Sequence, residues 1–350
     1  MTSWGAQGRT HTGKSEKVMA ELSALLDRYC NVDGQHGRLT MPMAHDALAA
    51  RDWALKLDGL SMEDRLRQLR LTPAQSELLS PLLAMDCHND QRQGGFLTQL
   101  QWYALGDYDF FRMFDKLGRY KIAQGMNALS SSILNDARAE LLLSSPVQSM
   151  TQADGKATVT TRSGKVFTAS AVVMAVPMNT RADIAFTPQL SQVKLDMSRQ
   201  RHTGAGTKAY VHVKQKVGNW FGMAPLPHPI TMAWTEHERD DGTVLVVFGP
   251  PGGIDITDEA SVQAALRKLL PKVEVQAVTG YQWNDDPFSK GTWCFYRQNQ
   301  LTQGLRGMQA REGALFFASA DIANGWRGFV DGAIETGLAS ALQVRTHLNK

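Results

Sequence analysis

The chain has 350 residues, of which 37 are basic and 34 acidic, so its formal net charge is only +3. This near-balance gives no basic field for nucleic acid, and no apolar run approaches the ~18 residues of a membrane span. Three scattered cysteines, Cys30, Cys87 and Cys294, argue against a disulfide framework and a zinc knuckle, so we expect no metal site. With no apolar leader and no C-terminal S-K-L signal, we expect an intracellular, cytoplasmic protein.

The stretch GRTHTGKS, residues 8–15, fits the phosphate-binding pattern G-x-x-x-x-G-K-[ST]. The helix that should follow is predicted, because an apolar stripe runs from Val18 to Leu26 after Ser15, a candidate N-cap. The segment before Gly8 is neither rich in β-branched residues nor long enough for a buried strand, so we predict no strand there. No later apolar run ends in the aspartate that would hold magnesium. We therefore favour a polar loop before a helix over a nucleotide site.

Two kinds of periodicity divide the chain. From residue 15 to about 135, apolar residues recur at intervals of three and four, which predicts a series of helices. After that, β-rich runs alternate with turn dipeptides such as Asp154-Gly155, Ser163-Gly164 and Asp241-Gly242, interrupted by a helix that starts near Asp258. Because a helical block precedes a β-rich block, we predict an α+β fold with a mixed sheet.

The C-terminal segment is predicted to form a strand, ALFFAS, a glycine-rich loop and a helix, FVDGAIETGLASALQVRTHL. Small residues, among them Gly332 and Gly337, keep one side of that helix narrow, and its N-terminus would offer N–H groups to an anionic ligand. Close packing of the helix on a sheet explains the same residues, and on the pattern alone we prefer that interpretation.

Several stretches, taken in order, resemble the flavin-dependent monoamine oxidase family, and especially its fungal members that hold FAD non-covalently. They run from NVDGQHGR near residue 31, through LGRYKIAQGMNAL, SSPVQSM, SAVVMAVPMNT and GTKAYVHV, to QWNDDPFSKGTWCFYR and LFFASADIANGWRGFVDGAIETG. They cover nearly the whole chain in the family's order. The resemblance implies an α+β and α/β architecture: a substrate domain with a mixed sheet and helices, joined to the C-terminal part of an FAD-binding domain.

The resemblance also implies a division into domains. Residues 1–135 would form the helical part of the substrate domain, with a return into the FAD domain near 120–135. Residues 136–180 would be FAD-domain strands, 181–285 the rest of the substrate domain, and 286–350 the C-terminal FAD-binding strand–loop–helix. Such oxidases open with a strand, a G-x-G-x-x-G turn and a helix, a Rossmann unit that this sequence lacks. By this register, roughly 140 residues, about one nucleotide-binding domain, are missing, and we expect the chain alone to bind little FAD and show no measurable amine oxidation.

Three positions are implied to be catalytic. Lys208, in GTK, matches the lysine that holds a water against the flavin N5 edge, where a buried ammonium would favour negative charge on the reduced ring. Trp293 and Phe329 match the two aromatic walls that flank the substrate amine. Facing π surfaces orient an alkyl amine and exclude water. Without the resemblance, these residues would be interpreted as a solvent-facing strand lysine and two core aromatics.

Five positions are implied to bind the cofactor. Trp283 matches a tryptophan that packs near the flavin, and Val147 matches a residue whose backbone meets the adenine. Asp321, Gly328 and Val330 fall in the segment that lines the ribityl, pyrophosphate and pyrimidine side of FAD.

Other positions qualify the cofactor assignment. Thr292 stands where covalent members carry the cysteine that bonds the flavin, and Cys294 is displaced by two positions. A hydroxyl cannot form that thioether, so the implied FAD is non-covalent. The chain departs from the family beside the expected cofactor path, at Gln124-Gly125 in place of two glycines and at Ala320, which lacks a hydroxyl for a phosphate.

The implied reaction is FAD-dependent oxidative deamination of a small-molecule amine to an imine and then an aldehyde or ketone, with O2 reoxidising the flavin and yielding hydrogen peroxide. The alternative is a non-catalytic remnant of the fold that binds a partner or small molecule without flavin. Retention of Lys208, Trp293 and Phe329 favours the enzyme, and the missing Rossmann unit favours the remnant. The sequence leaves the amine and the oligomeric state open, with a homo-oligomer among the options.

Overall fold

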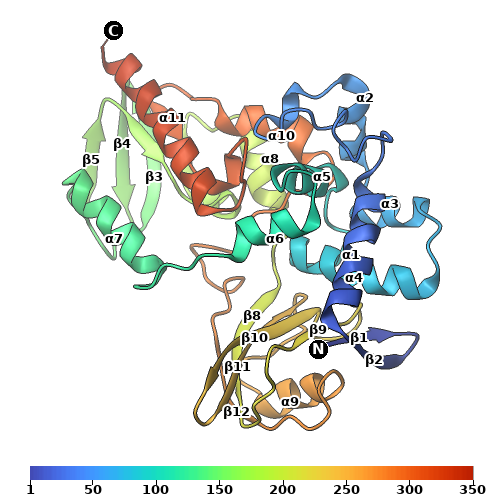
Figure 1. The fold of residues 1–350 in the computed structure, drawn as a ribbon. Helices are drawn as coiled ribbons and strands as arrows, with labels where there is room; N and C mark the ends of the chain where they lie inside the picture. Colours follow the sequence, from blue (N-terminus) through green and yellow to red (C-terminus); the bar gives the residue numbers. More distant parts are fainter. Residues whose placement is uncertain (350) are drawn as a thin grey trace.

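The structure, a computed structural model, describes residues 1–349 and arranges them in three sheets and a layer of helices. In Figure 1 a seven-stranded sheet lies at the bottom, the helices α1 to α6 lie above it, and a four-stranded sheet lies at the upper left. Between residues 140 and 250, all of which the structure describes, α8 (Gln192–Gln200) is the one α-helix. The order of a helical block and then a β-rich block is therefore confirmed.

Helices joined by loops make up the segment from residue 15 to residue 137, as the apolar periodicity predicts. They are α1 (Ser15–Cys30), α2 (Asp52–Leu55), α3 (Met62–Gln68), α4 (Pro73–Cys87), α5 (Phe96–Leu105), α6 (Phe110–Gly118) and α7 (Met126–Ala137). In α4, Thr72 and Gln75 form a capping box, and Pro73 takes the first helical position. The helix ends at His88, whose left-handed backbone (φ 49°) turns the chain out of the helix.

The N-terminal segment forms a hairpin, so the prediction of no strand before Gly8 was wrong. β1 (Thr2–Ala6) pairs antiparallel with β2 (Arg9–Gly13), and β1 also pairs parallel with β9 of the large sheet. Pairing with β2 and β9 makes this strand, and a short run with a single β-branched residue, Thr2, does not predict it. The GRTHTGKS segment is thus half of a hairpin and not a phosphate loop. The N-cap of α1 is Lys14, and the hydroxyl of Ser15 accepts a hydrogen bond from Thr2 Oγ1 (3.0 Å).

The large sheet has the strand order β12-β8-β11-β10-β9-β1-β2. Its other strands are β8 (Thr207–Val213), β9 (Phe221–Met223), β10 (Met232–Arg239), β11 (Gly242–Gly249) and β12 (Val275–Gly280). Only β1 and β9 pair in parallel within it, so the sheet is mixed, as predicted. The helix α9 (Glu259–Arg267), capped by Asp258, packs Val262 and Leu266 on one face of this sheet. The domain boundaries drawn from the resemblance stay a prediction.

A second β-region contains the sheet β5-β4-β3-β7 and the parallel pair β6 and β13. The strands are β3 (Val147–Ala153), β4 (Lys156–Thr161), β5 (Val166–Ala169), β6 (Val172–Met174), β7 (Ala185–Thr187) and β13 (Leu315–Phe317). The predicted turn at Asp154-Gly155 joins β3 to β4, and both of its residues have positive φ (50° and 73°).

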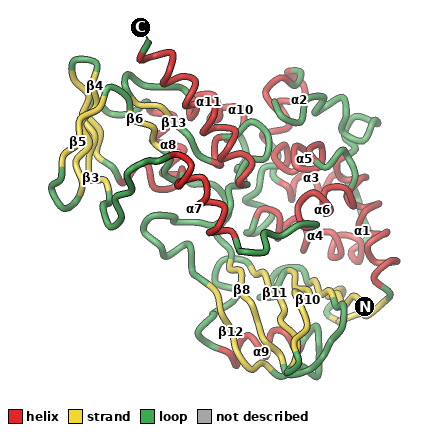
Figure 2. Tube along the Cα trace, turned by 60° about the vertical axis from the view of Figure 1, so that its left-hand side comes forward, coloured by secondary structure: helices red, strands yellow, loops and turns green. Residues whose placement is uncertain are grey.

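The chain closes with the predicted strand–loop–helix unit: β13, a 3₁₀ turn η4 (Ala320–Ile322) and α11 (Val330–Leu348). Figure 2 shows β6 beside β13, with α11 and α10 (Gln300–Gln309) close to them. A Cβ at Gly332 would lie 2.4 Å from the carbonyl oxygen of Trp326. This glycine therefore permits the close packing of α11 that the sequence suggested.

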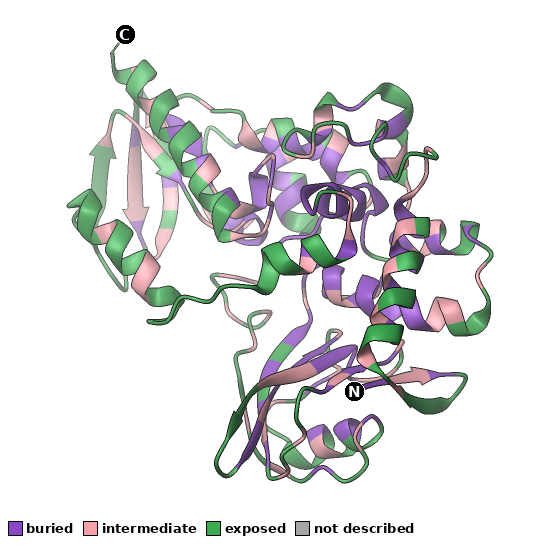
Figure 3. Cartoon of the chain, viewed as in Figure 1, coloured by how far each residue is buried: buried purple, intermediate pink, exposed green. Residues whose placement is uncertain are grey.

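Burial distinguishes the helices (Figure 3). Every residue of α5 is buried, whereas no residue of α7 is, and α11 carries an exposed apolar stripe of Val330, Ile334, Leu338 and Leu342. The main core joins α1, α4 and α5 to the large sheet through residues such as Leu22, Leu79, Leu100 and Met223. Among the helices of residues 1–349, none combines the length and apolarity needed to cross a membrane.

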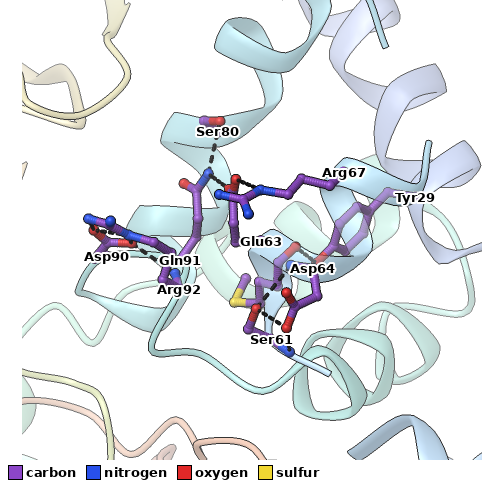
Figure 4. A network of polar contacts seen from close by, with 10 residues as sticks. Tyr29, Ser61, Glu63, Asp64, Arg67, Ser80, Asp90, Gln91 and Arg92 are labelled. Carbon is purple, nitrogen blue, oxygen red and sulfur yellow. Dashed lines mark hydrogen bonds and ion pairs between the residues drawn. The ribbon is translucent and has the colours of Figure 1, made fainter. Parts of the chain in front are cut away.

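A polar network fixes the loop after α4 (Figure 4). Gln91 Nε2 donates to Glu63 Oε2 (2.8 Å) and to Ser80 Oγ (3.1 Å), and Glu63 also pairs with Arg67. Ser61 and Asp64 form a capping box on α3. These contacts tie α3 to α4 and to the loop that follows His88.

Candidate active site

A cavity of about 620 Å³ opens where β8, the ends of β6 and β13, and α11 meet. One group of lining residues, here called the aromatic wall, consists of His88, Lys208, Trp283, Thr292 and Trp293. A second group, the small-residue wall, consists of Val173, Ala175, Ala318, Ala320, Ala333 and Gly337. The rest of the lining is Pro177, His202, Ser289, Gly291, Ser319 and Asp321. The carboxyl ends of parallel strands, here β6 and β13, are a usual place for a ligand.

Four of the site residues predicted from the sequence line this cavity together. They are Lys208, Trp283, Trp293 and Asp321. They come from β8, from the segment after β12 and from η4, so segments more than 100 residues apart in sequence converge here.

The other four predicted residues lie outside the lining. Phe329 is half-buried and packs against Trp102, with ring centroids 5.1 Å apart. Gly328 has φ 85°, a left-handed backbone that favours glycine, and Val330 is the exposed first residue of α11. Val147 begins β3. Their assigned roles stay predictions, and Phe329 does not form a second aromatic side of this cavity.

The indole of Trp293 is held by several neighbours. Its Nε1–H donates to the carbonyl oxygen of Asp86 (2.9 Å), and its face stacks on the His88 imidazole at 4.0 Å with an interplanar angle of 5°. Phe248 approaches the indole edge-to-face at 6.0 Å. The ring is therefore fixed before any ligand enters.

His88 is the site residue that the sequence analysis missed. Its Nδ1 lies 2.8 Å from Thr292 Oγ1, and burial lowers the pKa of its imidazole to about 3, helped by the nearby charge of Lys208. The imidazole is therefore neutral at physiological pH. Its only local signal is a position just after the apolar helix pattern of α4, where a left-handed residue is typical, and its partners lie about 200 residues away.

Lys208 lines the cavity, but the structure corrects the expectation of a buried ammonium. On β8, Thr207, Ala209 and Val211 are buried whereas Lys208 is exposed, because alternate residues of a strand face opposite sides. Its Nζ lies over the rings of Tyr210 (5.2 Å) and Phe248 (5.6 Å). The ammonium is thus placed by two cation–π contacts.

Asp321 anchors the segment after β13. Its Oδ2 accepts a hydrogen bond from the Met178 N–H (2.6 Å), and its backbone oxygen accepts one from the Tyr296 hydroxyl (2.7 Å). Ser319 caps η4 by accepting from the Asp321 N–H (3.1 Å). These bonds hold the turn that carries Ala320 into the small-residue wall.

A buried trio, His202, Cys294 and Asp321, brings three metal-ligating atoms within 4.8 Å of one another. These groups are already engaged: His202 Nδ1 accepts from the Gly204 N–H (3.1 Å), and Cys294 Sγ lies 3.8 Å from the Asp321 carbonyl oxygen. Burial raises the pKa of the Cys294 thiol well above its usual value, which disfavours the thiolate that a metal needs. We therefore assign no metal to the trio.

The small-residue wall suits a flat ring system. Alanines and glycine leave the backbone close to the cavity, and a Cβ at Gly337 would meet no atom within 4 Å. The N-terminus of α11, which has no side-chain cap, lies outside the lining of the cavity. A planar group such as a flavin ring fits the small-residue wall.

Comparison with known proteins gives the class. Residues 2–345 match the family described as flavin containing amine oxidoreductase, and the chain belongs to this family.

Particular relatives narrow the comparison. The chain is 42% identical over 333 residues to pseudooxynicotine dehydrogenase of Pseudomonas sp, covering 94% of this chain and 67% of that protein. It is 33% identical to nicotine dehydrogenase of Pseudomonas putida (strain DSM 28022 / S16), covering 88% of this chain and 64% of that protein. The chain thus spans about two thirds of the length of these relatives.

Solved structures support the fold. A triple mutant of putrescine oxidase superposes with a TM-score of 0.80 at 19% identity, covering 99% of this chain and 80% of that one. Cyclohexylamine oxidase from Brevibacterium oxydans IH-35A gives a TM-score of 0.76 at 15% identity, covering 100% and 81%. The predicted flavin amine oxidase fold, with mixed sheets and helices, is confirmed.

Proposed function

We propose that the protein oxidises a small-molecule amine with non-covalently bound FAD, giving an imine that hydrolyses to a carbonyl compound, while O2 is reduced to hydrogen peroxide. The observation that carries the proposal is the cavity in which Lys208, Trp283 and Trp293 meet the small-residue wall. Family membership supports the flavin. The relatives described above are bacterial, so the proposal rests on the family as a whole and not on its fungal branch.

For the substrate, we propose an alkyl amine attached to a pyridine ring. The support is the similarity to proteins named pseudooxynicotine dehydrogenase and nicotine dehydrogenase. The aromatic wall suits such a molecule, because indole and imidazole faces stack on a heteroaromatic ring and exclude water around the amine.

The chain's own residues would divide the work as follows. The small-residue wall would hold the cofactor ring, and Asp321 would fix the turn beside it. Trp293 would orient the amine, and the Lys208 ammonium would favour negative charge developing nearby. When bound, the flavin supplies the acceptor for the hydride equivalent from the carbon next to the amine nitrogen. Thr292 offers a hydroxyl and no thiol, which supports a non-covalent cofactor.

The alternative is a protein that binds a small molecule in this cavity without redox chemistry. One observation favours it: His88, Thr292 and Trp293 already hold the aromatic wall in place, so this wall could bind an aromatic molecule whether or not a flavin lies beside it.

The test is a titration of the protein with excess FAD, followed by the visible absorbance under anaerobic addition of nicotine-like amines and by a peroxide assay in air. Amine-dependent bleaching with peroxide in air supports the oxidation and overturns the expectation that the chain alone is inactive. Bound flavin that no amine bleaches favours the alternative. Absence of any flavin binding contradicts the proposed cofactor site.

The substitution Trp293→Ala sharpens the assignment. We expect a loss of about 100-fold in amine turnover with FAD affinity changed less than about threefold, because the indole is assigned to the substrate side. Trp53→Ala, at an exposed tryptophan outside the cavity, is the control and should change neither. Equal losses of turnover and FAD affinity would move Trp293 into the cofactor shell.

A further inference from the structure

We propose that His88 is a positioning residue that fixes the plane of the Trp293 indole in the cavity; the catalytic part of this inference rests on the proposed function. The two rings stack almost parallel at 4.0 Å. The indole Nε1–H also binds the carbonyl of Asp86, two residues before His88. One short segment at the end of α4 therefore holds both the face and the polar edge of Trp293.

His88 is itself held by the segments it joins. Thr292 Oγ1, adjacent to Trp293 in sequence, lies 2.8 Å from Nδ1 of the imidazole. The carbonyl oxygen of His88 accepts a hydrogen bond from the Ala205 N–H (3.1 Å). His88 thus joins three segments: its backbone carbonyl ties the end of α4 to the loop before β8, and its imidazole contacts the loop that carries Trp293. Stacking on the indole and the contact to Thr292 restrict the rotation of the imidazole.

Gly206 shows how closely the imidazole is packed. A Cβ at Gly206 would lie 2.4 Å from Cδ2 and 2.6 Å from Nε2 of His88. Two residues after Gly206 the chain reaches Lys208, so the imidazole also limits where β8 can begin. The start of β8 and the plane of the indole are in this way both packed against the imidazole of His88.

The charge state of His88 agrees with a structural role beside a cation. The imidazole is buried, and the charged group that faces it is Lys208 on β8, which lowers its pKa together with burial. The carboxyl of Asp86, on the same helix, hydrogen-bonds Gln99 instead (2.8 Å). A neutral imidazole stacks on the indole without adding a second positive charge to the cavity.

The test compares His88→Leu, which removes the ring, with His88→Phe, which keeps a stacking ring and removes the contact to Thr292. His237→Leu, at an exposed histidine on β10, is the control. We expect His88→Leu to raise KM for the amine about tenfold with a smaller change in kcat, and His88→Phe to stay within about threefold. FAD affinity should be unchanged in both variants.

A readout independent of catalysis separates this inference from the proposed function. In a ¹H–¹⁵N spectrum, the Trp293 indole signal, assigned by its loss in Trp293→Phe, should shift and exchange faster with solvent in His88→Leu and not in the control. If the wild type oxidises no amine, the proposed function fails while this spectrum still tests His88. An unshifted indole signal in a folded His88→Leu protein, or an unchanged KM in an active one, would overturn the inference.

Discussion

The aromatic wall and the small-residue wall of the cavity differ in how firmly neighbouring segments hold them. In the aromatic wall, His88, Thr292 and Trp293 are joined by stacking and hydrogen bonds to segments about 200 residues apart. In the small-residue wall, Gly337 meets nothing within 4 Å of where its Cβ would be. The aromatic wall is preorganised, whereas the small-residue wall is open at Gly337. This difference assigns substrate orientation to the first wall and cofactor accommodation to the second.

The largest effect on stability should come from Asp86, whose backbone carbonyl binds the indole of Trp293 and whose carboxyl is buried. Burial raises the pKa of Asp86 to about 7, against 3.8 for the free group. Because the folded protein keeps a proton that the unfolded chain releases, its free energy of unfolding should fall as the pH rises from about 4 to about 7, by up to ~4 kcal/mol. Asp86→Asn should remove this dependence and be more stable than wild type at pH 8. Parallel pH profiles of urea unfolding for the two proteins would contradict the prediction.

A single added methyl group at Gly204 should disrupt the aromatic wall. A Cβ at Gly204 would lie 2.0 Å from the carbonyl oxygen of Trp293, a backbone atom that cannot move without displacing the wall. Gly204→Ala should therefore cost about 3 kcal/mol of stability. Gly118→Ala, in α6, where a Cβ meets nothing within 4 Å, is the matched control and should cost no stability. The measurement is the thermal midpoint by circular dichroism. Equal midpoints for the two variants would show that the backbone of the aromatic wall shifts to accept the methyl group at little cost.

A smaller effect is expected at Lys208, the charged member of the aromatic wall. Lys208→Met keeps the length of the side chain on β8 and removes the ammonium, so it should slow the flavin chemistry, including reoxidation by O2, about tenfold with little change in fold. Lys214→Met, at an exposed lysine that pairs with Glu274, is the control. Stopped-flow rates of flavin reduction and reoxidation give the answer. Unchanged rates in Lys208→Met would remove the assigned role.

Local sequence patterns predicted much of the fold but few of the contacts within the aromatic wall. Apolar periodicity found α1, and turn dipeptides such as Asp154-Gly155 found hairpins, because these signals lie within a few residues of each other. The strand β1 was missed because one of its two partners, β9, lies over 200 residues away, and its turn to β2, Gln7-Gly8, is not one of the dipeptides typical of hairpins.

The sequence supported two different predictions for the exposure of the Lys208 side chain. Strand alternation favoured a solvent-facing lysine, the resemblance favoured a buried one, and the structure agrees with the alternation while still placing the side chain at the cavity. His88 gave no comparable signal, since an imidazole after a helix does not specify what it stacks on. Its role depends on contacts that only the folded chain brings together.

The smallest expected effect concerns Gly337, in the small-residue wall. In Gly337→Ala the new methyl group would meet no atom within 4 Å, and alanine is the better helix former, so α11 should gain about 1 kcal/mol of stability. Because Gly337 lines the cavity, the same methyl group should narrow the space assigned to the cofactor and weaken FAD binding severalfold, with KM for the amine unchanged. The control is Gly118→Ala, which should leave FAD affinity unaltered. Thermal unfolding and an FAD titration measure the two effects on one sample. A stabilised Gly337→Ala protein with unaltered FAD affinity and a raised KM would show that the small-residue wall receives the amine, and the assignment of the two walls would have to be exchanged.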